Sequence, residues 1–306
     1  MRLDIKDILY TFTVILLLSV TQAQAAPPDL DNSRDAILQQ DLERHLRRMG
    51  LEEAVDTGKL AVALVDITDE NHPKVAAVNG DKMMYAASLP KIAILFGAFK
   101  RIEAGDMELN EETRNLLIQM IRYSSNQAAS EMLDRVGKPY LARLLQSPPY
   151  RLYDPARNGG LWVGKAYGKN DLWKRDPLHH LSHGATALQV ARFYYLLEQN
   201  ELVSPALTRE MMEILSKPGI THKFVKGLAG EYPGARIYRK SGTWKQWHAD
   251  SALVEHDGKR YIAVALAESS EGGQWMTNLI VALDRMVQAP APSIAVFDHS
   301  EPVFLF

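Results

Sequence analysis

Tyr85-Ala-Ala-Ser-Leu-Pro-Lys-Ile-Ala-Ile-Leu-Phe96 is the stretch around which the rest of the chain is organised. It places Ser88 three residues before Lys91, and an apolar run follows at once. If Ser88 begins a helix, the two side chains form an i,i+3 pair on one face. A lysine amine in that position can accept the hydroxyl proton and activate the serine as a nucleophile. The alternative is a serine N-cap beside a solvated lysine.

The composition indicates an ordinary globular protein. Of the 306 residues, 46% are hydrophobic and 24% are charged, which gives enough core for one large domain or two small ones. The net charge of −2 at pH 7 gives no reason to expect nucleic acid or an anionic membrane as a partner. The chain has no cysteine, which excludes disulfides, thiolate chemistry and cysteine-based metal sites.

The first 25 residues have the pattern of a secretory signal peptide. Arg2 and Lys6 supply a basic region, an apolar run covers residues 8–20, and Ala23-Gln-Ala25 has the small residues of a cleavage site. A retained N-terminal anchor is the alternative. We expect cleavage after Ala25 and a single mature domain, 26–306, that is exported to the periplasm or secreted. We also expect it to be monomeric and without a transmembrane anchor after cleavage.

Strand patterns lie at both ends of the chain and helical patterns lie in the middle. Asn32 or Ser33 is the expected N-cap of the first helix, Thr186 is that of a later one, and Asp257-Gly258 favours a type I′ hairpin turn. Helices are expected at 33–49, 92–104, 110–123, 126–136, 139–146, 186–197, 204–215 and 274–287, and strands at 60–69, 74–79, 236–240, 248–255 and 260–268. The predicted fold class is α+β, with an antiparallel five-stranded sheet flanked by helices. An all-α part at about 92–215 is inserted between the N- and C-terminal strands.

Residues 147–184 are predicted to be a long irregular loop, and loops of that length inside a compact domain are often functional. The loop carries His179, His180 and His183, whose spacing could serve a zinc site or a general base. No carboxylate spacing completes a metal site, so we expect no metal and no cofactor.

Four tryptophans divide by their position along the chain. Trp244 and Trp247 are the candidates for lining a substrate cleft, whereas Trp162 and Trp173 are expected to pack or to close the loop.

Two short motifs follow Ser88 in a suggestive order. Tyr123-Ser-Ser-Asn126 lies at a helix boundary, and Lys240-Ser-Gly-Thr243 is expected to end a strand. The set Ser-x-x-Lys, Ser-x-Asn and Lys-Ser-Gly resembles the penicillin-recognising serine hydrolases, which include class A β-lactamases and penicillin-binding proteins. The resemblance covers roughly residues 35–288 and includes Tyr85, three residues before the serine.

The resemblance implies a role for each motif residue in acylation. Ser88 would attack an amide or ester carbonyl, and Lys91 would take its proton directly or through a water. Ser124 would pass a proton to the leaving nitrogen, and Asn126 would hold both the substrate amide and Lys91.

The third motif is implied to bind the substrate. Lys240, Ser241 and Thr243 would hold a substrate carboxylate, and the backbone N–H groups of Ser88 and Thr243 would form the oxyanion hole. A small β-lactam or a peptidoglycan-like molecule is therefore the expected partner.

The chain departs from class A β-lactamases in the residue that releases the acyl group. Those enzymes carry a glutamate in this loop, but no glutamate lies between Glu131 and Glu198 here. Asp154, Asp171 and Asp176 are the carboxylates of the loop. The expected activity is therefore hydrolysis of β-lactams or related amides and esters. The alternatives are a D,D-peptidase or esterase with slow deacylation, and a non-catalytic cell-wall-binding protein of the same fold.

Overall fold

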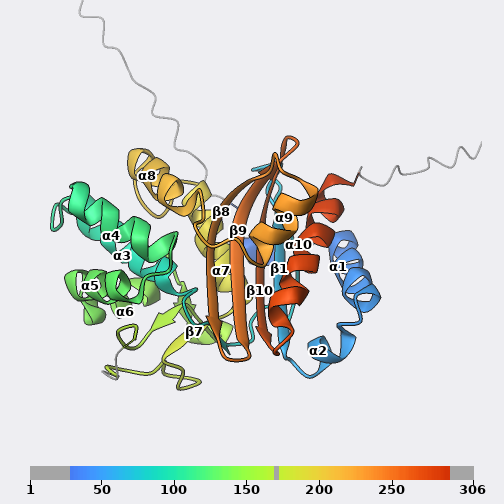
Figure 1. The fold of residues 1–306 in the computed structure, drawn as a ribbon, viewed down its shortest axis with the longest axis horizontal. Coiled ribbons are helices and arrows are strands. Elements are labelled where there is room, and N and C mark those ends of the chain that lie inside the picture. The colour runs from blue at the N-terminus through green and yellow to red at the C-terminus, as the bar shows by residue number, and fades with distance from the viewer. Residues whose placement is uncertain (1–27, 169–171, 290–306) are drawn as a thin grey trace, which may run out of the picture.

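The computed structural model describes residues 28–168 and 172–289, which are built around a five-stranded antiparallel sheet with helices on both faces (Figure 1). The strand order is β2-β1-β10-β9-β8, so the C-terminal strand β10 lies in the middle and β8 lies at one edge. The five strands are β1 (Leu60–Asp66), β2 (Lys74–Val78), β8 (Arg236–Trp244), β9 (Trp247–His256) and β10 (Lys259–Glu268). The predicted fold class and all five strands are confirmed, whereas the predicted signal peptide lies outside the described residues.

The helices form a group at each end of the chain and a larger group between the strands. They are α1 (Ala36–Arg48), α2 (Glu52–Asp56), α3 (Lys91–Glu103), α4 (Glu111–Ile121), α5 (Asn126–Val136), α6 (Lys138–Gln146), α7 (Ala187–Glu198), α8 (Pro205–Leu215), α9 (Phe224–Glu231) and α10 (Gly272–Gln288). Within the described residues, no helix is long and apolar enough to cross a membrane.

The central strands are apolar on both faces, and each face belongs to a different core. Along β1, Ala61, Ala63 and Val65 join the core shared with α3 and α7. The alternate residues Leu60 and Val62 join the core shared with α1 and α10. Side chains of a strand point to opposite faces in turn, so this short apolar run serves both layers.

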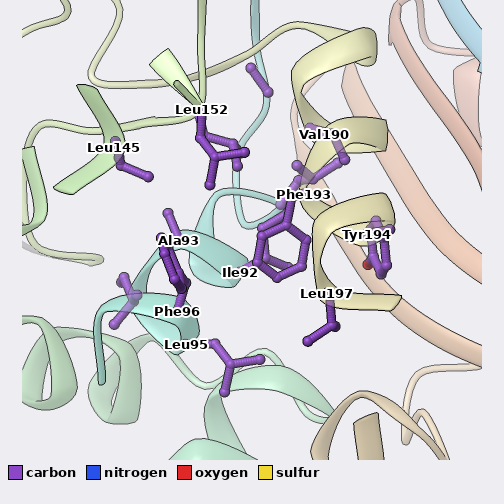
Figure 2. Close-up of a cluster of buried hydrophobic side chains, with 14 of the residues drawn as sticks. Ile92, Ala93, Leu95, Phe96, Leu145, Leu152, Val190, Phe193, Tyr194 and Leu197 are labelled. Atoms are coloured by element: carbon purple, nitrogen blue, oxygen red, sulfur yellow. The ribbon is translucent and has the colours of Figure 1, made fainter. Parts of the chain in front are cut away.

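The helix that follows Ser88 is buried deeply enough to fix the position of its first residue. In Figure 2, Ile92 and Phe96 of α3 meet Phe193 and Leu197 of α7 in one apolar cluster. Every residue of α3 from Lys91 to Phe99 is buried. Packing on all sides leaves α3 little freedom, and the N-terminus of α3 therefore holds Lys91 in place.

Several predicted boundaries are wrong for local reasons. The first helix is capped by Asp35, which accepts a hydrogen bond from the Leu38 N–H, and neither Asn32 nor Ser33 is its cap. Strand β8 continues through the Lys240 motif to Trp244, because all nine of its residues pair with β9. Helices α2 and α9 have no counterpart in the predicted pattern because both are short.

Other local predictions hold in detail. Thr186 caps α7 by accepting a hydrogen bond from the Gln189 N–H. Asp257 and Gly258 both have positive φ, as a type I′ turn requires.

The predicted irregular loop is better ordered than expected. It contains four short strands, β4 (Tyr153–Asp154), β5 (Gly159–Gly160), β6 (Trp162–Val163) and β7 (His183–Ala185). β7 pairs with both β6 and β3 (Met84–Tyr85), so the end of the loop is joined to the residues just before Ser88. Isolated two-residue strands carry too little periodicity to be recognised in a sequence.

Candidate active site

Ser88 lies in a tight turn between β3 and α3, and not in the first turn of a helix as the sequence suggested. The Leu89 N–H donates to the Ala86 oxygen (3.0 Å) and the Lys91 N–H donates to the Ser88 oxygen (3.3 Å). Two successive turns, rather than one turn of a helix, therefore lead from Ser88 to Lys91. Ala87 has a φ of 50°, which is unusual for a residue other than glycine. No residue within the described ranges bonds the Ser88 hydroxyl or its backbone N–H.

Lys91 is buried, and four oxygens lie within hydrogen-bond distance of its amine. Its Nζ donates to the Ser124 carbonyl oxygen (2.6 Å) and to Asn126 Oδ1 (2.9 Å). It also lies 3.3 Å from both Ser124 Oγ and the Ser125 carbonyl oxygen. Burial lowers the pKa of Lys91 from 10.5 to about 7. The amine therefore has a neutral fraction at physiological pH, as a general base needs.

Ser124 lies between two lysine amines. Its Oγ is 3.3 Å from Lys91 Nζ and 3.0 Å from Lys240 Nζ. Burial, and then repulsion by Lys91, keeps the pKa of Lys240 well below its usual value. A hydroxyl oxygen that accepts from amines on both sides can turn its own proton outward, toward the cleft.

Ser124 and its neighbours are positioned by the start of α5. Ser124 has a φ of 58°, and Ser125 caps the helix by accepting from the Ala128 N–H. Serine is among the preferred N-cap residues, because its side-chain oxygen can accept from a backbone N–H of the first turn.

The edge strand β8 passes directly over the Ser88 turn. A Cβ placed on Gly242 would lie 2.2 Å from the Ala86 carbonyl oxygen and 2.8 Å from the Ser88 nitrogen. Only glycine allows this contact, which brings the backbone next to Thr243 against the unpaired N–H of Ser88. Lys240, Ser241 and Thr243 are therefore gathered at the same turn as Ser88.

Lys223 is a site residue that the sequence did not reveal. Its buried Nζ donates to the Gly242 carbonyl oxygen (2.6 Å), to Thr243 Oγ1 (2.9 Å) and to the Ala249 carbonyl oxygen (3.1 Å). Burial lowers its pKa to about 8. The buried pair of Arg239 and Asp250 lies alongside, at 2.7 Å. No motif marks Lys223, because its role depends on a contact with a strand distant in sequence.

Ser88 opens into a cleft of about 780 Å³. The cleft is lined by Tyr85, Ala87, Ser88, Asn126, Lys165, Tyr167, Gly168, Leu181, Ser182, His183, Thr243, Trp244 and Trp247. Trp244 and Trp247 thus lie where the sequence suggested, and Trp162 is buried in the core while Trp173 is partly exposed. No aspartate or glutamate lines the cleft among the residues that the structure describes.

The loop carboxylates that the structure places are occupied elsewhere. Asp154 accepts from the Ala156 N–H (2.9 Å) at the start of a single 3₁₀ turn. Asp176 is fully buried and accepts from the Tyr153 hydroxyl (3.1 Å) and the His179 N–H (2.9 Å), so it organises the loop. Asp171 lies outside the described residues. Neither Asp154 nor Asp176 can therefore serve as the base suggested from the sequence.

The three loop histidines do not converge. His179 Nε2 lies 2.8 Å from Asn158 Oδ1, whereas His183 Nε2 lies 3.2 Å from the Lys165 carbonyl oxygen. In the described part of the chain, no three His, Cys, Asp or Glu side chains are grouped closely enough to hold a metal ion. Burial lowers the pKa of His183 to about 4, so its ring is neutral at physiological pH.

Comparison with known proteins identifies a family whose model matches this chain. The model of the Beta-lactamase enzyme family matches residues 41–115 and 111–287. Comparison with curated proteins gives no match.

Solved structures share the fold at low sequence identity. A mutant of PBP-A, an acyl-enzyme complex with penicillin G, is 18% identical with a TM-score of 0.62, covering 82% of this chain and 96% of its own. A mutant class A β-lactamase of the last common ancestor of Gram-negative bacteria, bound to a transition-state analogue, is 18% identical with a TM-score of 0.64 (81% and 98% covered). A β-lactamase from Sphaerobacter thermophilus is 16% identical with a TM-score of 0.60 (78% and 95% covered).

Proposed function

Because this chain belongs to the beta-lactamase enzyme family, we propose that it is an exported serine hydrolase that forms an acyl-enzyme at Ser88 with β-lactams or related amides and esters. The observation that carries the proposal is the position of Ser124 Oγ between Lys91 Nζ and Lys240 Nζ, beside the turn that presents Ser88. Three motifs from distant parts of the chain meet there, at one cleft. A non-catalytic binding protein would have no need of buried lysines with lowered pKa values.

Acylation needs one proton removed and one delivered. The neutral amine of Lys91 takes the proton of the Ser88 hydroxyl, directly or through one water, as the serine oxygen attacks the carbonyl carbon. The carbonyl oxygen gains negative charge, which the unpaired Ser88 N–H and the backbone N–H of Thr243 stabilise. The C–N bond then breaks, and Ser124 gives its proton to the leaving nitrogen while the Lys91 ammonium replaces that proton.

Deacylation has less support than acylation, which favours the second candidate, a penicillin-binding enzyme with slow deacylation. Hydrolysis of the acyl-enzyme needs a base for the attacking water. The ring of Tyr167 lies 4.6 Å from Lys91 Nζ, and the Tyr167 carbonyl is held by the Ser130 hydroxyl (2.8 Å). An aromatic ring excludes water from the amine and supplies no base.

Intact mass measurement after mixing with benzylpenicillin tests both steps. We expect a stable adduct equal to the mass of the drug on the wild type, and none on Ser88→Ala. An unmodified wild type with intact drug in solution would refute the acylation at Ser88. An unmodified protein with fully hydrolysed drug would instead support fast turnover and contradict slow deacylation.

The acylation rate should rise with pH across neutrality. Lys91 acts as a base only when neutral, and its pKa of about 7 means that the neutral fraction grows from pH 6 to pH 8. We expect the second-order rate constant to rise about tenfold per pH unit below about pH 6.5 and to level off above about pH 8. Stopped-flow measurement with a chromogenic β-lactam gives the profile. A flat profile over this range would contradict the role of Lys91.

Lys223 should contribute to binding of the substrate carboxylate through Thr243. We expect Lys223→Met to lower the acylation rate constant by about 10- to 100-fold, because a charge-assisted hydrogen bond to the Thr243 hydroxyl is lost. Lys226→Met is the matched control, since Lys226 is exposed on α9. An unchanged rate constant in Lys223→Met would show that the lysine has only a structural role.

A further inference from the structure

Residues 172–178, here called the loop tip, expose apolar side chains outside the cleft. The loop tip lies in the connection between β6 and β7, close to β7 in Figure 1. Leu172, Trp173 and Leu178 are 48%, 38% and 42% exposed. Among the residues that the structure describes, the other exposed large apolar side chains are scattered singly: Ile37, Tyr123 and Trp244. Exposed apolar side chains gathered in one short segment indicate a surface that contacts another molecule.

The backbone of the loop tip is held by hydrogen bonds to buried parts of the chain. The N–H groups of Trp173 and Lys174 both donate to the Gly164 carbonyl oxygen, at 2.9 Å each. The carboxylate of Asp176, the one buried residue of the loop tip, accepts from the Leu178 N–H (3.2 Å). The apolar side chains are therefore exposed as part of the folded structure, on a backbone that is fixed.

The loop tip is also basic. Lys174 and Arg175 are exposed, and the Arg175 guanidinium donates to the His180 carbonyl oxygen (2.8 Å). Within the described ranges neither cation pairs with a carboxylate. Residues 147–184 carry six Lys or Arg against three Asp, whereas the whole chain has a net charge of −2. Positive charge is thus concentrated on this part of a chain whose overall charge gave no reason to expect an anionic membrane.

The size and composition of the loop tip distinguish between kinds of partner. A stable protein interface uses about 20–30 residues on each side, more than this segment offers. A polysaccharide could stack on Trp173 but would gain little from Leu172 and Leu178. An anionic bilayer surface suits all of them. Aliphatic and indole side chains enter the boundary between headgroups and acyl chains, and the cations meet the lipid phosphates.

We propose that the loop tip binds the surface of a membrane rich in anionic phospholipids. This binding goes beyond the proposed hydrolase activity and does not depend on it. Gly168 and Leu181, on either side of the loop tip in sequence, line the Ser88 cleft. Binding through the loop tip therefore holds the cleft close to the bilayer. Substrates confined to that surface would meet Ser88 at a raised local concentration.

Sedimentation with lipid vesicles tests the proposal on the mature chain, residues 26–306. We expect the wild type to bind phosphatidylcholine vesicles with about one-third phosphatidylglycerol at least about tenfold more tightly than phosphatidylcholine alone, and less tightly at high salt. Lys174→Gln/Arg175→Gln should weaken binding to the anionic vesicles by about 25-fold, because each cation contributes about fivefold. Leu172→Ser/Leu178→Ser should weaken it by about tenfold or more, because two apolar side chains no longer leave water.

Two control variants on α1 remove the same kinds of group elsewhere. Arg47→Gln/Arg48→Gln removes two adjacent exposed cations, and Ile37→Ser removes an exposed apolar side chain. Both should bind vesicles like the wild type. All variants share the rest of the chain, so a difference in binding comes from the substituted side chains alone. Thermal unfolding should be nearly unchanged in the loop variants, because the substituted side chains are exposed.

A wild type that does not bind anionic vesicles would overturn the proposal. Unchanged binding in both loop variants, or equal losses in the α1 controls, would overturn it as well. Binding to purified peptidoglycan without binding to vesicles would replace the membrane by a polymer partner. Ser88→Ala should bind vesicles like the wild type, so a failure of acylation at Ser88 and a failure of membrane binding are measured separately.

Discussion

Replacing Lys91 by methionine is expected to lower the rate constant for acylation by about 10³-fold, because the proposed general base is removed. Methionine has a similar length, so it fills the buried position at the start of α3 with little change in volume. The backbone turn that presents Ser88 does not depend on the amine, since it is closed by main-chain hydrogen bonds. The variant should therefore be folded and nearly inactive.

Stability measurements make this prediction sharper. The pKa of Lys91 is lowered in the folded protein, from 10.5 to about 7, so the unfolded chain binds more protons between these values. The free energy of unfolding of the wild type therefore gains a contribution as the pH rises from about 7 to about 10.5. Below about pH 7 the buried ammonium lowers the free energy of unfolding of the wild type. Lys91→Met has no ammonium at this position and should not be destabilised in this way.

Thermal unfolding at pH 6 and acylation by a chromogenic β-lactam give the two readouts. We expect Lys91→Met to unfold at a temperature equal to or above that of the wild type. Acylation of Lys91→Met within tenfold of the wild-type rate would remove Lys91 from the mechanism.

Gly242→Ala is expected to lower the acylation rate constant by about 10²- to 10³-fold, the size of an effect on the oxyanion hole. The added Cβ would lie 2.2 Å from the Ala86 carbonyl oxygen and 2.8 Å from the Ser88 nitrogen. These atoms belong to the backbone, so either β8 or the Ser88 turn must move. The same displacement should lower the free energy of unfolding by about 1–3 kcal/mol.

Gly230→Ala is the matched control for this substitution. A Cβ on Gly230 would have no atom within 4 Å, and the residue lies in α9. The control should keep full activity and gain a few tenths of a kcal/mol or more in stability, because alanine favours a helix. Full activity in Gly242→Ala would show that the contact between β8 and the Ser88 turn is not needed for acylation.

Sequence periodicity was sufficient to predict the helices and strands that bury one full face. The strands of the sheet and the helices of the middle part are long enough for their apolar positions to repeat, and their predicted positions agree with the structure to within a few residues. Helix α9, by contrast, has eight residues and no side-chain cap, so it has no sequence signal of its own.

Motif spacing located residues of the candidate site but not their arrangement. Ser88, Ser124 and Lys240 could be identified because each lies in a short pattern with a known chemical use. The turn at Ser88 was mistaken for a helix start because Pro90 and the following apolar run fit either structure.

The remaining site residues depend on contacts between distant segments. Lys223 reaches Thr243 only because α9 packs beside β9, and Tyr167 stacks on His183 because β6, just before Tyr167, is paired with β7. Neither contact produces a recognisable pattern within a short stretch of the sequence. Tertiary packing decides such contacts, and a single sequence does not encode them at short range.

The position of β10 in the sheet also decides how the protein can fold. Leu60 of β1 pairs with Ala267 of β10, so the central pairing of the sheet joins two ends of the chain. A pairing between such distant segments has a high loop-closure entropy and forms slowly, whereas the helices between them can form from local contacts first. During synthesis β1 lacks this neighbour until residues 259–268 have emerged. The yield of native protein will therefore depend on folding rate, and on protection of the early strands from aggregation, as well as on equilibrium stability.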